Sequence, residues 1–235
     1  SALYDGNSWL VENYTTNYIT AASLTDFDDV GQPERLSVVA AAFSSNYALN
    51  PSGFPYYEEI EAIVSNDFLE ADLLLNEQFS KETLQKTISL QDSSVILHLA
   101  TPAALLPGNP RESFFLLGDG TRVTLRDLRN WDLSNVELLV LSGVETAVDG
   151  IFSGGEEILG LGYSFQNSGV RTVMTSLWNA ADRSAPLMML EFYSAFSRAR
   201  LTKSEALRIA QLSLIERGLS HPYYWANFII IGNGY

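Results

Sequence analysis

Two short runs of the sequence carry residue types that nucleophilic catalysis uses. The run 141–146 places Ser142 and Glu145 at the end of an apolar stretch, and the earlier run 98–103 begins with His98. A hydroxyl needs a nearby base such as imidazole before it can attack a carbonyl carbon. The chain contains no cysteine, which excludes a thiol nucleophile, a disulfide and a thiolate metal site.

The hydroxyls in these runs are poorly placed to act as nucleophiles. Ser142 and Thr146, on either side of position 144, are expected to pack in the core or to hydrogen-bond in a turn. His98 is predicted to be a satisfied core residue, and His221 to lie in the connection to the last strand. Two separated histidines without clustered carboxylates predict no metal site.

The elements that would position these runs alternate between short apolar stretches and segments of helical period. This pattern predicts an α/β fold with a mostly parallel sheet covered on both faces. The predicted strands are 36–43, 94–100, 136–141, 170–177 and 227–231, with 71–75 and 114–117 as shorter ones.

Several helix ends are readable in the sequence. Pro55 is expected to begin one helix, and Ser80 to cap a second. Thr202 and Glu205 have capping-box spacing, and Gly218 is expected to end that helix. A further helix is predicted over 185–198, where an apolar stripe of methionine and aromatic residues indicates core packing.

Two other runs contain residue types found in metal-binding or nucleotide-binding loops, but simpler explanations fit them better. The acidic stretch 26–29 lacks the glycine and the distal glutamate of an EF-hand loop, so a solvated loop is expected. The glycines in 154–162 match neither a P-loop nor a dinucleotide fingerprint, and tight turns and helix packing explain them better. We therefore predict no cofactor.

The net charge and the hydropathy of the chain limit the classes of partner that it is expected to bind. The 28 acidic against 14 basic residues give a net charge of −14, which argues against nucleic acid and anionic membrane surfaces. No apolar run reaches the roughly 18–20 residues of a membrane span, so no membrane insertion is predicted. The absence of cysteine leaves both the cytoplasm and an exported location at the cell surface open.

Taken in order, motifs along nearly the whole chain resemble the CHAT domain family, bacterial relatives of the caspases that belong with separase- and gingipain-type cysteine peptidases. The landmarks are 3–6 with 9–14, 96–101, 137–146, 155–162, 176–178 with Asp182, 192–193, 205–211 and 221–232. The resemblance implies one caspase-like three-layer sandwich over 1–235, with a central sheet of about six mainly parallel strands. We expect it to be excised from a larger protein, with TPR repeats or an export-associated region upstream.

The resemblance also implies that active members carry a histidine after one strand and a cysteine after the next. Those positions hold Pro102 and Val144 here, and Ala103 stands where glycine is usual. Neither a pyrrolidine ring nor an isopropyl group can attack a carbonyl or transfer a proton. Natural loss of the catalytic dyad is the interpretation, with the loop 102–110 stiffened by its three prolines.

A residual peptide groove is predicted where the substrate would bind. Its candidate lining residues are Ser142, Glu145, Trp178, Asn179 and Asp182, of which Trp178 is expected to be mainly core. Pro102 and Val144 are expected to face each other across neighbouring strands about 4.8 Å apart, with the cleft partly filled.

Three functions follow from these patterns. The first is an inactive CHAT-like pseudo-peptidase that binds a protein or peptide, with a basic ligand favoured by the net charge. The second is a terminal assembly domain with no ligand of its own, in an exported or TPR-containing protein. The third is a peptidase with an unconventional nucleophile.

Overall fold

The computed structural model describes residues 2–25, 36–43, 56–64, 70–145, 147–148, 151–152, 156–178, 184–199 and 201–235. The strands are β1 (Leu36–Ala42), β2 (Glu70–Leu75), β3 (Ser94–Ala104), β4 (Phe114–Leu116), β5 (Arg122–Thr124), β6 (Val136–Glu145), β7 (Ala147–Val148), β8 (Ile151–Phe152), β9 (Thr172–Ser176) and β10 (Phe228–Gly232). The α-helices are α1 (Leu10–Asn13), α2 (Tyr56–Val64), α3 (Lys81–Ser89), α4 (Glu156–Gln166), α5 (Ser184–Ala199), α6 (Lys203–Glu216) and α7 (Pro222–Trp225). Short 3-10 turns are η1 (Ala22–Leu24), η2 (Asn76–Gln78), η3 (Pro110–Glu112) and η4 (Asp127–Asn130).

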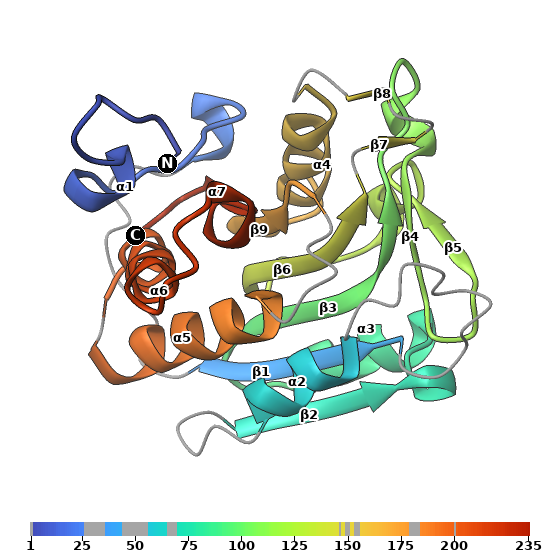
Figure 1. Ribbon diagram of the computed structural model, residues 1–235. Helices are drawn as coiled ribbons and strands as arrows, with labels where there is room; N and C mark the ends of the chain where they lie inside the picture. The colour runs from blue at the N-terminus through green and yellow to red at the C-terminus, as the bar shows by residue number, and fades with distance from the viewer. Residues whose placement is uncertain are drawn as a thin grey trace.

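A central sheet runs through the described residues in the order β10-β9-β6-β3-β1-β2 (Figure 1). Along this order neighbouring strands are parallel from β2 to β9, and β10 is antiparallel to β9. The short strands β4 and β5 extend the sheet from the end of β3 by antiparallel pairing. The inner strands β1, β3 and β9 are buried on both faces, which is why each reads as a largely apolar run. The predicted α/β fold with about six main strands is confirmed.

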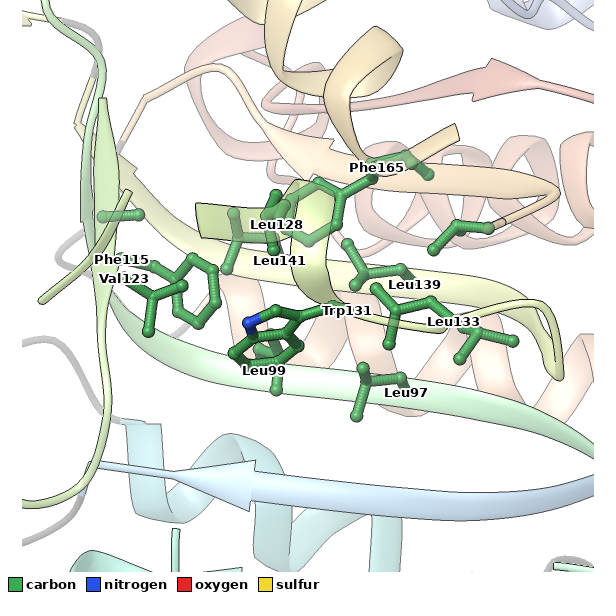
Figure 2. Close-up of a cluster of buried hydrophobic side chains, with 14 of the residues drawn as sticks. Leu97, Leu99, Phe115, Val123, Leu128, Trp131, Leu133, Leu139, Leu141 and Phe165 are labelled. Atoms are coloured by element: carbon green, nitrogen blue, oxygen red, sulfur yellow. The ribbon is translucent and has the colours of Figure 1, made fainter. Parts of the chain in front are cut away.

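Two layers cover the sheet. Apolar side chains of α1, α2, α5, α6 and α7 pack on one face, here called the α5 layer. The opposite face packs against α3, α4, the β4–β5 hairpin and η4, here called the α4 layer. In the α4 layer, Trp131 and Phe165 lie among leucines of β3 and β6, with Phe115 of β4 beside them (Figure 2).

The helix ends predicted at Ser80, Thr202 and Gly218 are confirmed. The Ser80 side chain accepts a hydrogen bond from the Thr83 backbone N–H at 3.2 Å, and Thr202 with Glu205 forms a complete capping box. Gly218 follows the end of α6 with a φ of +88°, a conformation that suits glycine. Pro55 and the acidic stretch 26–29 lie outside the described residues.

Two strands extend further than predicted. β3 continues past Ala100 to Ala104, and β6 past Leu141 to Glu145, so Pro102 lies inside a strand rather than in a loop. The extension is possible because β4 pairs with the end of β3 at Ala103. The loop expected from Pro102 therefore begins at Leu105.

The sheet edge at β10 is covered by the N-terminal segment. The Tyr18 backbone N–H donates to the Ile230 carbonyl at 2.8 Å, and the Gly232 N–H donates to the Tyr18 carbonyl at 2.8 Å. The Arg208 side chain holds the same segment, donating to the Val11 and Glu12 carbonyls at 2.6 Å each. These contacts leave β2 as the outer strand at the other end of the main sheet in the described structure.

No described helix combines the length and the hydropathy needed to cross a lipid bilayer.

Candidate functional site

The candidate site lies where β3 and β6 end side by side. Their register pairs Ala100 with Ser142 and Ala103 with Val144, so two residues of β3 oppose one residue of β6 in between. This is a β-bulge, the setting within a sheet that tolerates a proline without a backbone N–H. The two strands are neighbours as expected, but Val144 pairs with Ala103, and Pro102 lies in the bulge.

Gly143 closes the bulge on the β6 side. Its φ is +83°, and a Cβ built there would lie 2.5 Å from Tyr56 Cε1 and 2.7 Å from the Thr101 carbonyl oxygen. Only glycine combines this backbone conformation with such close neighbours. The Tyr56 ring, which is 2 % exposed, therefore fills the space over this strand end.

Ser142 is fully buried on the face of the sheet that carries the α5 layer. Its register partner Ala100 packs in that layer, whereas the preceding residue, Leu141, packs in the α4 layer. The Ser142 hydroxyl has no hydrogen-bond partner among the described residues. Within the described part of the chain, no base therefore hydrogen-bonds the Ser142 hydroxyl.

His98 lies on the same face of the sheet, and both of its ring nitrogens are occupied. Nε2 lies 3.1 Å from Glu59 Oε1, and Nδ1 lies 3.0 Å from the Tyr193 hydroxyl. A carboxylate can only accept, so Nε2 donates to Glu59. In the neutral imidazole with this tautomer, Nδ1 accepts from the Tyr193 hydroxyl. All three side chains are 0 % exposed, which confirms His98 as a satisfied core residue.

The phenol of Tyr193 predicts a stability loss at high pH. Burial raises the pKa of Tyr193, and the Glu59 carboxylate raises it further, so the folded chain favours the neutral phenol. That contribution is fully present below the unfolded value of about 10 and declines by about 1.4 kcal/mol per pH unit above it. The free energy of unfolding can be measured in urea at pH values from about 8.5 to 11, around the ordinary phenol pKa. It should fall less steeply with pH for Tyr193→Phe than for the parent chain.

Tyr14→Phe is the control for that experiment, because Tyr14 is 64 % exposed and should keep the parent's slope. Equal slopes for Tyr193→Phe and Tyr14→Phe would contradict the assignment.

The second histidine has a local structural role. His221 is the N-cap of α7, where its Nδ1 accepts a hydrogen bond from the Tyr223 backbone N–H at 3.2 Å. Trp178 follows β9 and contacts the same helix: its indole N–H donates to the Tyr223 carbonyl at 3.0 Å, and its ring stacks on Tyr223. Trp178 also packs partly buried against the core, as predicted.

The remaining groove residues are only partly placed. The backbone of Glu145 pairs with Ala104 at the end of β6. Thr146, Asn179 and Asp182 lie outside the described residues. Among the described residues no three histidine, aspartate or glutamate side chains gather closely enough to hold a metal ion.

Sequence reasoning located β3 and β6, with each strand ending four residues early, but missed what covers their ends. Tyr56 is the first residue of α2 and follows 12 residues outside the described structure, so nothing local in the sequence connects it with Gly143. The Glu59 and Tyr193 partners of His98 are likewise distant, 39 and 95 residues away in the chain. A lone histidine within an apolar strand was the one signal in the sequence that a buried polar partner lies nearby.

Together these observations define an α/β sandwich in which the candidate site lies at the carboxyl ends of the parallel strands β3 and β6. The family comparison then identifies the group of proteins concerned. The sequence matches the CHAT domain over residues 1–233, and the chain belongs to the CHAT domain family.

Individual proteins and solved structures match this chain over only a small part of their own length. Tetratricopeptide repeat protein 28 of Mus musculus is 30 % identical over 114 residues, which cover 47 % of this chain and 4 % of that protein. Two crystal structures of the Saccharomyces cerevisiae separase–securin complex are similar with TM-scores of 0.48 and 0.47, at 18 % and 16 % identity. The matches cover 85 % and 86 % of this chain, and 12 % and 13 % of the separase-complex chains.

Proposed function

We propose that this chain is a catalytically inactive CHAT domain that acts as a protein- or peptide-interaction module. The observation that carries the proposal is the packing of Tyr56 over Gly143, at the strand end that the family resemblance equates with the nucleophile. Pro102 and Val144, at the two expected catalytic positions, offer no atom that could transfer a proton or attack a carbonyl.

The surroundings of the site support inactivity. Peptide hydrolysis needs a nucleophile, a base that takes its proton, and a route by which the peptide carbonyl reaches both. Ser142 is buried without a hydrogen-bond partner among the described residues, and Glu59 and Tyr193 occupy both nitrogens of His98. A serine–histidine pair is therefore not assembled at this strand end.

The outer strand β2 supports the binding role. In the described structure it pairs only with β1, so its other edge presents backbone N–H and C=O groups. Glu70 and Asp72 are exposed on this strand, and Leu73 is 37 % exposed. An extended peptide that adds a strand here would meet acidic side chains, which favour a basic sequence.

The likeness to a tetratricopeptide repeat protein supports a place beside such repeats. In that setting a CHAT module would bind a segment of a protein that the repeats bring near it. The net charge of −14 favours the same basic ligand.

The test is fluorescence polarisation with a library of extended ten-residue peptides (about one strand's length) of graded charge. Basic peptides should bind, and Glu70→Lys with Asp72→Lys should weaken them by about tenfold. Glu216→Lys, an exposed charge reversal at the end of α6, is the matched control and should leave binding unchanged. Binding of no peptide, or equal binding by the β2 variant, would overturn the proposed peptide site.

A further inference from the structure

One pocket gathers positive charge on this acidic chain. Its cavity volume is about 350 Å³, and its lining includes Arg111, Arg126 and Arg129. Only 14 of the 235 residues are lysine or arginine, against 28 acidic residues. Three of the 14 basic residues therefore line one pocket. Basic residues scattered over the surface for solubility would not produce this concentration.

Backbone contacts fix the walls of this arginine pocket. Arg111 lies in η3, Arg129 lies in η4, and Arg126 precedes η4. The Arg126 backbone N–H donates to the Arg111 carbonyl at 3.2 Å, which joins the two turns. Residues of α4 form the third wall. The arginines are thus anchored on rigid turns, as a preformed site requires.

Two of the three guanidinium groups are available for a ligand. Arg126 forms an ion pair with Glu112. Within the described residues, no hydrogen bond or ion pair is found for the side chains of Arg111 or Arg129. The nearby Asp127 carboxylate accepts from the Thr124 backbone N–H and hydroxyl at 3.0 and 2.7 Å, and these hydrogen bonds lower the pKa of Asp127.

The rest of the lining can contact an uncharged body. Leu125 and Pro110 are apolar, and the Tyr163 ring is 50 % exposed. α4 lies beside η3 at Gly160, where a built Cβ would be 3.9 Å from Pro110 Cβ, an ordinary van der Waals distance. Asn167, with an exposed amide, adds a donor and an acceptor.

We propose that the arginine pocket binds a phosphorylated small molecule, with Arg111 and Arg129 on the phosphate and Tyr163 against its body. Guanidinium groups match phosphate oxygens in bidentate geometry, and they are the strongest charged donors that a protein offers for this purpose. The cavity volume falls in the range of small-molecule sites rather than that of an extended peptide groove. This site is separate from the strand ends and from β2, so it does not depend on the proposed peptide binding.

Isothermal titration of the chain with inorganic phosphate, pyrophosphate, AMP, ADP and ATP tests the proposal, with adenosine and a phosphoserine peptide as further probes. At least one of the phosphorylated small molecules should bind at one site per chain, and adenosine should not. The Arg111→Gln and Arg129→Gln double variant should weaken that binding by about tenfold or more.

The matched control is Arg122→Gln, because the Arg122 guanidinium lies 4.4 Å from the centre of the Phe114 ring and does not line the pocket. It should leave the affinity unchanged, and circular dichroism should show that each variant is folded. Failure of all five phosphorylated compounds to bind, or equal affinity in the double variant, would overturn the proposal. Binding of the phosphoserine peptide alone would also overturn it and would assign the pocket to a protein partner.

Discussion

Gly143→Ala should be among the most destabilising single substitutions at the candidate site. Alanine at a φ of +83° is strained, and its Cβ would collide with the Tyr56 ring and the Thr101 carbonyl at 2.5 and 2.7 Å. Left-handed strain and overpacking each cost about 1–3 kcal/mol, so a combined loss of about 2–6 kcal/mol is expected. Urea unfolding, with the midpoint and slope fitted together, measures this loss.

Gly108→Ala separates the two causes of that loss. Gly108 has a similar φ of +77°, but a Cβ there would meet nothing within 4 Å, so only the backbone strain remains. The Gly108 variant should lose about 1 kcal/mol. Adding Tyr56→Ala to Gly143→Ala should cost less than the sum of the two single changes, because the ring that collides is gone. Equal losses at Gly143 and Gly108 would mean that Tyr56 does not fill this strand end.

Lys203→Met should also be strongly destabilising, for an electrostatic reason. Lys203 is 2 % exposed, and its Nζ lies 2.7 Å from Glu137 Oε1 and donates to the main-chain oxygen of Tyr235. Its loss leaves the buried Glu137 carboxylate with Arg171, whose Nε is 3.5 Å from Oε2. Removing one partner of a buried pair costs about 3–5 kcal/mol.

Two controls test that explanation by thermal or urea unfolding. The double variant Lys203→Met with Glu137→Leu should regain much of the loss, because no buried carboxylate remains without its ammonium partner. Arg217→Gln breaks the half-exposed pair with Glu191 and should cost no more than about 1 kcal/mol. A Lys203→Met variant as stable as Arg217→Gln would contradict the role of Lys203 as a buried counter-ion.

The central strands could be predicted because burial on both faces leaves a continuous apolar run, as in β1 and β9. The three-residue strand β5 is too short to produce such a run, and it was missed. The glycines of the 154–162 stretch obscured the helix α4. One of them, Gly162, packs so close to Ile231 that a Cβ built on it would lie 2.7 Å from the Ile231 side chain. Local pattern therefore located the main layers, while close packing between distant segments was not visible in it.

The candidate site was likewise only partly predictable from local sequence pattern. The chain positions of Ser142 and Val144 at a strand end followed from the sequence, and β3 and β6 do end together. The bulge that pairs Val144 with Ala103 depends on Gly143, Thr101 and Tyr56 packing at one point. Likewise, Arg111 and Arg129 meet only because two short turns are joined by a backbone hydrogen bond. Such arrangements arise from tertiary contacts, which periodicity does not encode.

The most direct test of the proposed inactivity is mass spectrometry of a broad peptide library incubated with the purified chain. Heat-inactivated chain and the Ser142→Ala variant serve as controls, since Ser142 is the buried hydroxyl at the strand end. The proposal predicts the same peptide spectrum in all three samples. Cleavage by the native chain that the Ser142→Ala variant or heating abolishes would contradict it.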